Sequence, residues 1–283
     1  MNAVNPVGVF DSGVGGLSVL REIRRELPKE DLLYVADSGY APYGDRTEQF
    51  IEARSVAIIE FLVSQGAKAI VVACNTATGA AIATLRSRFQ VPIVAMEPAV
   101  KPAAEQTQSG VVGVLATRRT LLSGNFAKLV ARFGADVNIL AQPCPGLVEQ
   151  VETGDLFGDA TRSLVEQYVV PLLEQGADTL VLGCTHYPFL APLIQTVAGP
   201  SVAIIDPAVA VARQLRRRLE SRDLLSPGAH PGTERFWMSG LPNRMKPVIS
   251  QLWMADVEVQ SFPDAVLLDG AYGNAGHTLR AVT

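Results

Sequence analysis

The sequence is poor in the features that mark membrane-spanning, disulfide-linked and zinc-knuckle proteins. Three cysteines occur among 283 residues, and none belongs to a C-x-x-C pair, so a disulfide framework and a zinc knuckle are both excluded. No apolar stretch reaches the ~18 residues that a membrane span needs, and the first ten residues, MNAVNPVGVF, lack the basic and apolar regions of a signal peptide. We therefore expect a cytoplasmic protein without a membrane partner.

Positive charge is also scarce. The chain has 24 Lys and Arg against 28 Asp and Glu, a formal net charge of -4, and a single short basic run at 216–218. Nucleic acid is therefore not an expected partner, because binding it requires a basic surface. Apolar residues make up 48% of the chain, which is enough to bury large cores, and the length predicts about two domains.

Short runs rich in Val, Ile and Leu alternate with longer helix-like segments. The expected strands are 6–10, 32–36, 69–73, 91–95, 111–115, 137–141, 179–183 and 202–205. The expected helices are 16–27, 47–65, 78–89, 121–133, 159–175 and 207–220. Further on, 236–239 and 257–262 are expected strands and 245–253 an expected helix. This alternation predicts an α/β fold with doubly wound, mostly parallel sheets.

The chain resembles itself at a nearly constant spacing. The segment QGAKAIVVACNT at 65–76 returns as QGADTLVLGCTH at 175–186. Two further pairs, EPAV at 97–100 with DPAV at 206–209 and VGVFDS at 7–12 with VGVLAT at 112–117, occur in the same order. The repeat predicts two similar domains related by a pseudo-twofold axis, with the active site in the cleft between them. We expect the second domain to span 98–206 and the first to be discontinuous, 1–97 plus 207–283.

Cys74 and Cys184 occupy equivalent positions in the repeat, each at the end of an expected strand. Ligands of open α/β sheets bind outside the carboxyl ends of the strands, so pseudo-symmetry would make the two thiols face each other. One isolated cysteine at such a position is more often core filler, but the duplication favours a function. The helix that follows each cysteine is expected to lower the thiol pKa and to attract anions.

Two equivalent acid/base groups on opposite sides of a small ligand suit a particular reaction class. One group can remove a proton from a carbon while the other returns a proton to the opposite face. The pair of cysteines therefore favours racemisation or epimerisation.

Several motifs carry a resemblance to a known family. They are FDSGVGGLSV at 10–19, ADS at 36–38 with PYG at 42–44, ACNTA at 73–77, EPAVKP at 97–102, GCTHYP at 183–188 and FWMSG at 236–240. In these segments the chain resembles glutamate racemases, in consistent order from about residue 7 to 262. The tail after Pro263 shows no family pattern.

The resemblance implies a cofactor-independent isomerase that interconverts L- and D-glutamate and supplies D-glutamate for peptidoglycan, and hence for the cell wall and cell shape. It implies that Cys74 is the base for D-glutamate and Cys184 the base for L-glutamate, with supporting acid/base roles for Asp11, Glu152 and His186. The implied substrate contacts are Asp11, Ser12, Pro42, Tyr43, Gly44, Asn75, Thr76, Thr117, Thr120, Thr185 and His186. A homodimer is compatible with the resemblance, although no residue pattern identifies a contact surface.

The residues themselves fit a dicarboxylate ligand held by neutral donors. The matched loops supply hydroxyls, an amide and backbone N–H groups, and none of these contacts is an arginine. The run from Gly13 to Ser18 superficially resembles a dinucleotide fingerprint, but Ser18 replaces the third glycine, so a substrate loop is preferred to NAD. Neither a metal site nor a pyridoxal lysine is indicated, and Cys144 is expected to be core filler.

Some alternatives remain open at this point. An isomerase with the same paired cysteines could act on aspartate or another small acid. Two similar lobes around a cleft also describe a solute-binding protein. A thiol hydrolase would use Cys184 as nucleophile and His186 as base, but it would leave Cys74 unexplained. Glu149 and Glu152 compete for one role, because a solvated helix face explains both, and His186 could either bond the thiol or cap the next helix.

Overall fold

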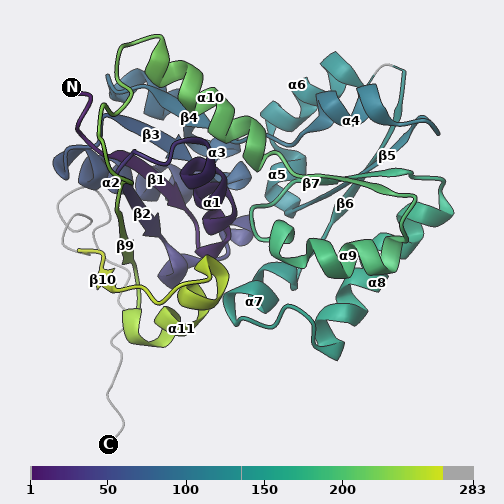
Figure 1. Cartoon of the computed structure of the whole chain (residues 1–283). Coiled ribbons are helices and arrows are strands. Elements are labelled where there is room, and N and C mark those ends of the chain that lie inside the picture. Colours follow the sequence, from purple (N-terminus) through teal and green to yellow (C-terminus); the bar gives the residue numbers. More distant parts are fainter. Residues whose placement is uncertain (1, 135, 264–283) are drawn as a thin grey trace, which may run out of the picture.

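The computed structural model describes residues 2–134 and 136–263. Its strands form two separate sheets in two lobes, the first at the left of Figure 1 and the second at the right. The first sheet contains β1 (Val7–Asp11), β2 (Leu32–Ala36), β3 (Ala69–Val72), β4 (Ile93–Ala95), β9 (Glu234–Met238) and β10 (Val259–Ser261). The second contains β5 (Val111–Ala116), β6 (Asn138–Pro143), β7 (Thr179–Leu182) and β8 (Ala203–Ile205). Every pairing among them is parallel.

The two sheets share one strand order. The first runs β10-β9-β2-β1-β3-β4 and the second runs β6-β5-β7-β8, so β2-β1-β3-β4 corresponds to β6-β5-β7-β8 in position and in chain order. The internal repeat of the sequence therefore has a structural counterpart. The predicted α/β class with two parallel-sheet domains is confirmed, and strands β9 and β10 lie at one edge of the first sheet.

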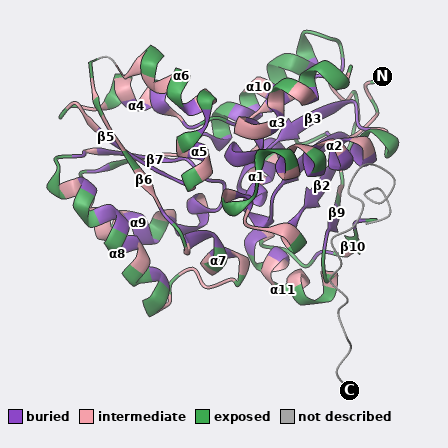
Figure 2. Ribbon diagram, turned by 180° about the vertical axis from the view of Figure 1, so that it is seen from behind, coloured by how far each residue is buried: buried purple, intermediate pink, exposed green. Residues whose placement is uncertain are grey.

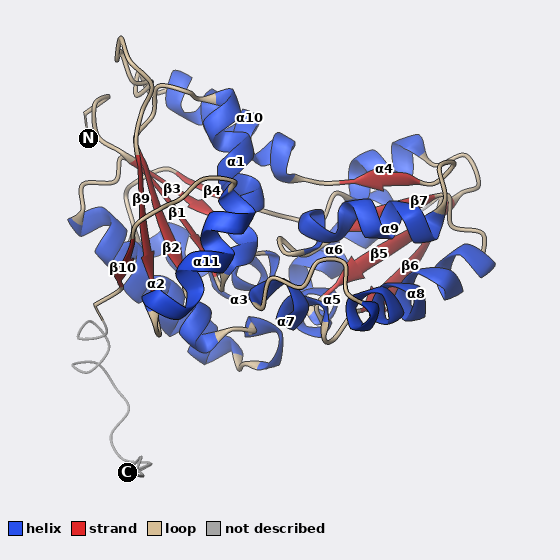
Figure 3. Cartoon of the chain, turned by 60° about the horizontal axis from the view of Figure 1, so that its bottom comes forward, coloured by secondary structure: helices blue, strands red, loops and turns tan. Residues whose placement is uncertain are grey.

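Helices cover both faces of each sheet (Figure 3). They are α1 (Leu17–Glu26), α2 (Glu48–Ser64), α3 (Asn75–Arg88), α4 (Val100–Gln106), α5 (Arg118–Leu122), α6 (Gly124–Phe133), α7 (Leu147–Glu152), α8 (Asp159–Glu174), α9 (Ala191–Ala198), α10 (Ala208–Glu220) and α11 (Pro242–Trp253). Helix α10 packs against α1 in the first lobe. Among the helices of the described residues, none is long and apolar enough to cross a bilayer.

The core follows from the pleat of the central strands, which are buried on both faces (Figure 2). Val7 and Val9 of β1 join the cluster that includes α1 and α10, whereas Phe10 joins the cluster that includes α2 and α3. Successive side chains of a strand point to opposite faces. A strand covered by helices on both sides is therefore apolar throughout, which explains the continuous apolar runs of the sequence.

The expected helix ranges leave out several helices, among them α4 and α9. Each of these two contains a proline close to its start, Pro102 in α4 and Pro192 in α9. Proline reads as a helix breaker, but the first turn tolerates it because the missing N–H has no partner there. Helix α3 also begins at Asn75 rather than Thr78, and this earlier start places its first turn directly beside Cys74.

Candidate active site

The carboxyl ends of β1, β3 and β7 meet around one cavity. Its lining comes from both lobes and consists of Ser12, Pro42, Tyr43, Gly44, Cys74, Asn75, Thr76, Thr117, Val148, Cys184, Thr185 and His186. Both repeated cysteines therefore open onto the same space. The cavity volume is about 10 Å³, close to the ~10–15 Å³ that a single water requires. A ligand the size of an amino acid needs the lobes or loops around this space to move apart.

Cys74 lies at the N-cap of α3. Its Sγ accepts a hydrogen bond from the backbone N–H of Ala77 at 3.3 Å and donates to Ser12 Oγ at 3.5 Å. Burial, followed by the negative charge of Asp11, raises the pKa of Cys74 to about 12. The expectation that the helix N-terminus lowers this pKa is wrong in net direction, because desolvation outweighs the N–H of Ala77. Cys74 is therefore a thiol at neutral pH.

Cys184 has a different partner. Its Sγ lies 3.7 Å from His186 Nδ1, and His186 Nε2 lies 2.7 Å from Glu152 Oε1. Burial alone would lower the pKa of His186, but the hydrogen bonds to Cys184 and Glu152 raise it well above its ordinary value. The imidazole is thus held as a cation between a sulfur and a carboxylate, and it bonds the thiol rather than only capping a helix.

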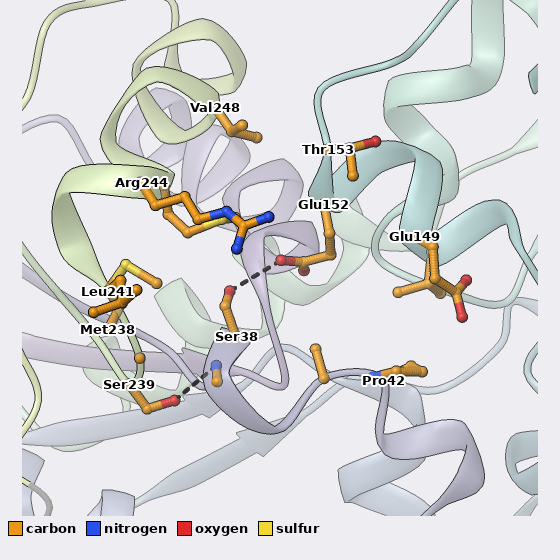
Figure 4. A pocket seen from close by; sticks show the side chains of 15 residues that line it. Ser38, Pro42, Glu149, Glu152, Thr153, Met238, Ser239, Leu241, Arg244 and Val248 are labelled. Carbon is orange, nitrogen blue, oxygen red and sulfur yellow. Dashed lines mark hydrogen bonds between the residues drawn. The ribbon is translucent and has the colours of Figure 1, made fainter. Parts of the chain in front are cut away.

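The structure separates the two acids of α7. Glu149 is exposed, whereas Glu152 reaches across to the first lobe. Besides His186, Glu152 accepts hydrogen bonds from the backbone N–H of Val14 at 2.7 Å and from Ser38 Oγ at 3.0 Å. The Ser38 contact is drawn in Figure 4. Glu152 therefore joins the two lobes directly beside the histidine that contacts Cys184.

Asp11 is fully buried at the end of β1. Its carboxylate accepts hydrogen bonds from the Gly13 N–H at 2.7 Å and from Thr185 Oγ1 at 2.8 Å. Burial raises the pKa of Asp11 to about 6, although the positive charge of His186 opposes the shift. Asp11 therefore changes charge in the range where acid/base chemistry at neutral pH is efficient.

The glycine-rich run after β1 packs against the second lobe. A Cβ at Gly13 would lie 1.8 Å from Glu152 Oε1, and one at Gly15 would lie 2.3 Å from His186 Nδ1. These glycines are needed because backbone of one lobe approaches side chains of the other. The motif therefore has a role other than nucleotide binding.

Hydroxyl and amide groups line the remaining wall of the cavity. Thr76 and Thr117 line the cavity, whereas Thr120, an expected contact, is not part of the lining; the three hydroxyl oxygens lie 2.9 to 3.0 Å apart. The side-chain nitrogen and oxygen of Asn75 are buried without a hydrogen-bond partner in the described part of the chain. A buried amide whose donor and acceptor are both unsatisfied is suited to bind a polar ligand. The lining residues given above include no arginine.

Sequence reasoning missed three buried residues, Tyr34, Asp37 and Arg54, that bond first-lobe loops next to the cavity. Tyr34 donates its hydroxyl to the carbonyl of Gly13 at 2.7 Å. Asp37 and Arg54 form a buried ion pair, and Tyr43, an expected substrate contact, donates its hydroxyl to Asp37. Asp37 and Ser38 follow β2 directly, at the same sheet edge as Asp11 and Cys74. That position is the sequence signal that could have identified Asp37 and Ser38 as site residues.

Two larger cavities adjoin the site. One of about 530 Å³ lies on the other side of Glu152 and is lined by Ser38 and by Arg244 and Val248 of α11 (Figure 4). Another of about 340 Å³ is lined by Cys144 together with Arg118. Cys144 itself is buried, and its Sγ donates to the carbonyl of Gln142 at 3.3 Å.

Comparison with known proteins agrees with this geometry. Residues 7–215 match the family model of the Asp/Glu/Hydantoin racemases. A curated glutamate racemase of Pseudomonas aeruginosa PAO1 is 58% identical over 248 residues, 87% of this chain and 93% of that protein.

Solved structures are also similar. Glutamate racemase from Francisella tularensis in complex with D-glutamate has a TM-score of 0.81 at 26% identity, over 93% of this chain and 99% of that one. Escherichia coli glutamate racemase in complex with L-glutamate and the activator UDP-MurNAc-ala has a TM-score of 0.79 at 33% identity, over 91% of this chain and 97% of that one. The chain therefore belongs to the Asp/Glu/Hydantoin racemase family and, within it, to the glutamate racemases.

Proposed function

We propose that the enzyme interconverts L- and D-glutamate by a two-base mechanism in which Cys74 and Cys184 are the proton donor and acceptor. One observation carries the proposal: the two cysteines end equivalent strands of two equivalent sheets and line a single cavity. A reaction that inverts one carbon needs a proton acceptor on one face and a donor on the other. No cofactor enters this scheme.

The surroundings of the two cysteines support opposite resting roles. Burial raises the pKa of Cys74 to about 12, so Cys74 begins as the donor. Cys184 lies beside the cationic His186, whose positive charge faces the Cys184 thiolate; after an L-to-D turnover Cys184 holds the abstracted proton and Cys74 is the thiolate, so Cys184 must release a proton and Cys74 must regain one before the next turnover in that direction. In the direction from L- to D-glutamate, the Cys184 thiolate removes the α-proton and the Cys74 thiol protonates the opposite face. The roles exchange in the reverse direction, with Cys74 as the base for D-glutamate.

Asp11 and Glu152 act on these two groups as proposed supporting residues. Asp11 contacts Ser12 and Thr185, the residues beside the two cysteines. Glu152 bonds His186 and thereby fixes the ring that faces Cys184. The deprotonated substrate carbon carries negative charge, and a fixed cation on one side with a neutral thiol on the other directs the new proton to the second face.

The substrate carboxylates are proposed to bind the neutral donors of the cavity wall. The open amide of Asn75 and the hydroxyls of Thr76, Thr117 and Thr120 supply donors on one side. Ser12, Thr185 and the backbone around Pro42, Tyr43 and Gly44 supply them on the others. Neutral donors leave the charge balance at the thiols unchanged, which an adjacent arginine would not.

The test is racemisation followed by circular dichroism, together with exchange of the substrate α-proton in heavy water. Wild-type enzyme is expected to racemise both glutamate enantiomers and to incorporate deuterium. Cys74→Ala and Cys184→Ala are each expected to abolish racemisation. Cys144→Ala is the matched control, because it removes a third buried thiol that is hydrogen-bonded to the carbonyl of Gln142 and does not line the cavity shared by Cys74 and Cys184, and it should retain activity.

The alternatives predict different results. A hydrolase would need Cys184 but tolerate Cys74→Ala, a binding protein would hold glutamate without exchange, and an aspartate racemase would turn over aspartate faster. We further propose that the D-glutamate is used for peptidoglycan synthesis and that the enzyme works in the cytoplasm. Depletion of the enzyme should then arrest growth unless D-glutamate is supplied.

A further inference from the structure

Arg54 is a buried cation outside the acid/base machinery. It lies in α2 with 2% of its side chain exposed, and its partner Asp37 is fully buried. The pair is bidentate: Nε donates to Asp37 Oδ2 at 2.8 Å, and Nη2 donates to Oδ1. The guanidinium also stacks over the ring of Tyr40 at 4.0 Å from its centroid. Arg54 therefore contacts two residues of one segment, residues 37–46, which we name the 37–46 loop.

The other side of the 37–46 loop forms part of the active cavity. Pro42, Tyr43 and Gly44 line the cavity, and the hydroxyl of Tyr43 reaches back to Asp37. A Cβ at Gly44 would lie 3.2 Å from that of Thr117 in the second lobe. The loop is thus the point at which the first lobe closes over the hydroxyl wall of the second.

Little regular structure holds this loop in place. It contains only two three-residue 3-10 turns, Ser38–Tyr40 and Tyr43–Asp45. Other contacts lie nearer its start, where Ser38 bonds Glu152 (Figure 4) and the Gly39 N–H donates to Ser239 Oγ at 3.1 Å. In the half that lines the cavity, the hydroxyl of Tyr43 leads to Asp37 and Arg54, and the rings of Tyr40 and Tyr43 pack against Phe50.

A buried ion pair is weak evidence of a stabilising role, because desolvation cancels much of the attraction. Here the pair is not even fully bonded, since Arg54 Nη1 is buried without a hydrogen-bond partner among the described residues. A bidentate guanidinium–carboxylate pair does, however, fix the relative orientation of its two side chains. Such a pair suits a position where the placement of a loop matters more than the free energy of unfolding.

We propose that Arg54, acting through Asp37, is a positioning residue that fixes the 37–46 loop as the wall of the glutamate site. This inference rests on the proposed racemase function. Residues 42–44 of the loop are proposed substrate contacts and make no hydrogen bond to Cys74, Cys184 or His186 in the described part of the chain, so loss of the anchor should weaken substrate binding while leaving proton transfer nearly intact. Preorganised contacts contribute affinity because the loop need not be ordered when the ligand binds.

The experiment compares steady-state racemisation of L-glutamate by wild type, Arg54→Lys and Tyr43→Phe. Arg54→Lys keeps the positive charge but loses the bidentate hydrogen bonds to Asp37. KM should therefore rise about tenfold above the wild-type value, while kcat stays within about threefold of wild type. Tyr43→Phe removes only the hydroxyl and should raise KM in the same direction by less, about threefold. Because Tyr43→Phe leaves the buried ion pair intact, it keeps the test valid if Arg54→Lys does not fold.

Lys68→Met is the matched control. Lys68 and Glu30 form another buried ion pair, with 0% and 2% of their side chains exposed, at the opposite ends of the strands. This substitution should lower the melting temperature without changing KM. An unchanged KM in folded Arg54→Lys and Tyr43→Phe overturns the inference, as does an equal rise in KM in Lys68→Met. Wild type that does not racemise glutamate overturns the proposed function and the inference with it, whereas active wild type with unaltered variants overturns only the inference.

Discussion

The charge state of Asp11 gives the most quantitative prediction. Asp11 is fully buried, and its pKa is raised from 3.8 to about 6, mainly by desolvation. Because the folded state binds this proton more tightly than the unfolded state, the cost of ionising Asp11 in the fold is absent below the unfolded pKa. The cost grows as the pH rises through the folded pKa and is complete above it. At pH 8 it amounts to about 3 kcal/mol, since each pKa unit corresponds to about 1.36 kcal/mol.

Asp11→Asn removes this cost without changing the shape of the side chain. Its amide oxygen can still accept from the Gly13 N–H, although the amide must rearrange the bond with Thr185. The difference in free energy of unfolding between variant and wild type should therefore shift in favour of the variant by about 2 kcal/mol between about pH 4.5 and pH 8. Taking the change of the difference with pH cancels any constant packing effect of the substitution.

Urea unfolding at several pH values measures this quantity, with the midpoint and slope fitted separately. Asp178→Asn is a suitable control, because hydrogen bonds lower the pKa of Asp178 to about 2. For this group the native state favours the charged form, so its stabilising contribution is lost as the pH falls toward the folded pKa. A difference between Asp11→Asn and wild type that does not vary with pH would refute the assignment of a raised pKa to Asp11.

Three further substitutions test two parts of the site and one buried ion pair outside it. Glu152→Gln removes the negative partner of His186, so the pKa of His186 should fall in an NMR titration and kcat should drop about 100-fold; an unchanged titration would show that the carboxylate does not hold the imidazolium. Gly15→Ala would place a Cβ 2.3 Å from His186 Nδ1 and should reduce activity more than Gly124→Ala, where a Cβ meets nothing within 4 Å; equal activities would contradict close packing of the lobes. Lys68→Met leaves a buried carboxylate unpaired and should cost about 3–5 kcal/mol in a denaturant titration, and a loss below about 1 kcal/mol would mean that the pair is hydrated.

Much of the site's location was predictable because it depends on local pattern and repetition. Apolar runs of strand length separated by helical segments indicated the parallel sheets, and the repeat of Cys74 as Cys184 placed both residues at strand ends. The paired strand order of the two sheets bears out the repeat itself. The domain boundaries near 97 and 207 stay a prediction, and residues 264–283 of the first domain's expected range lie outside the described structure.

The chemical state of these residues was not predictable, because it depends on burial and on partners distant in sequence. The helix N-terminus beside Cys74 suggested a lowered pKa, yet desolvation dominates and raises it. The choice between Glu149 and Glu152 required knowing which turn of α7 faces His186, 34 residues away. Arg54 gave no signal at all, since its partner Asp37 lies 17 residues earlier on another element.

The sequence alone thus determined which elements form and where their polar ends gather, because hydrophobic periodicity and duplication act over short windows of the chain. Tertiary structure decided which thiol has an imidazolium partner, which acid joins the lobes and what holds the loop over the cavity. Each of those outcomes arises from electrostatic interactions in a desolvated space, whose strength is set by atoms that only folding brings within a few ångströms.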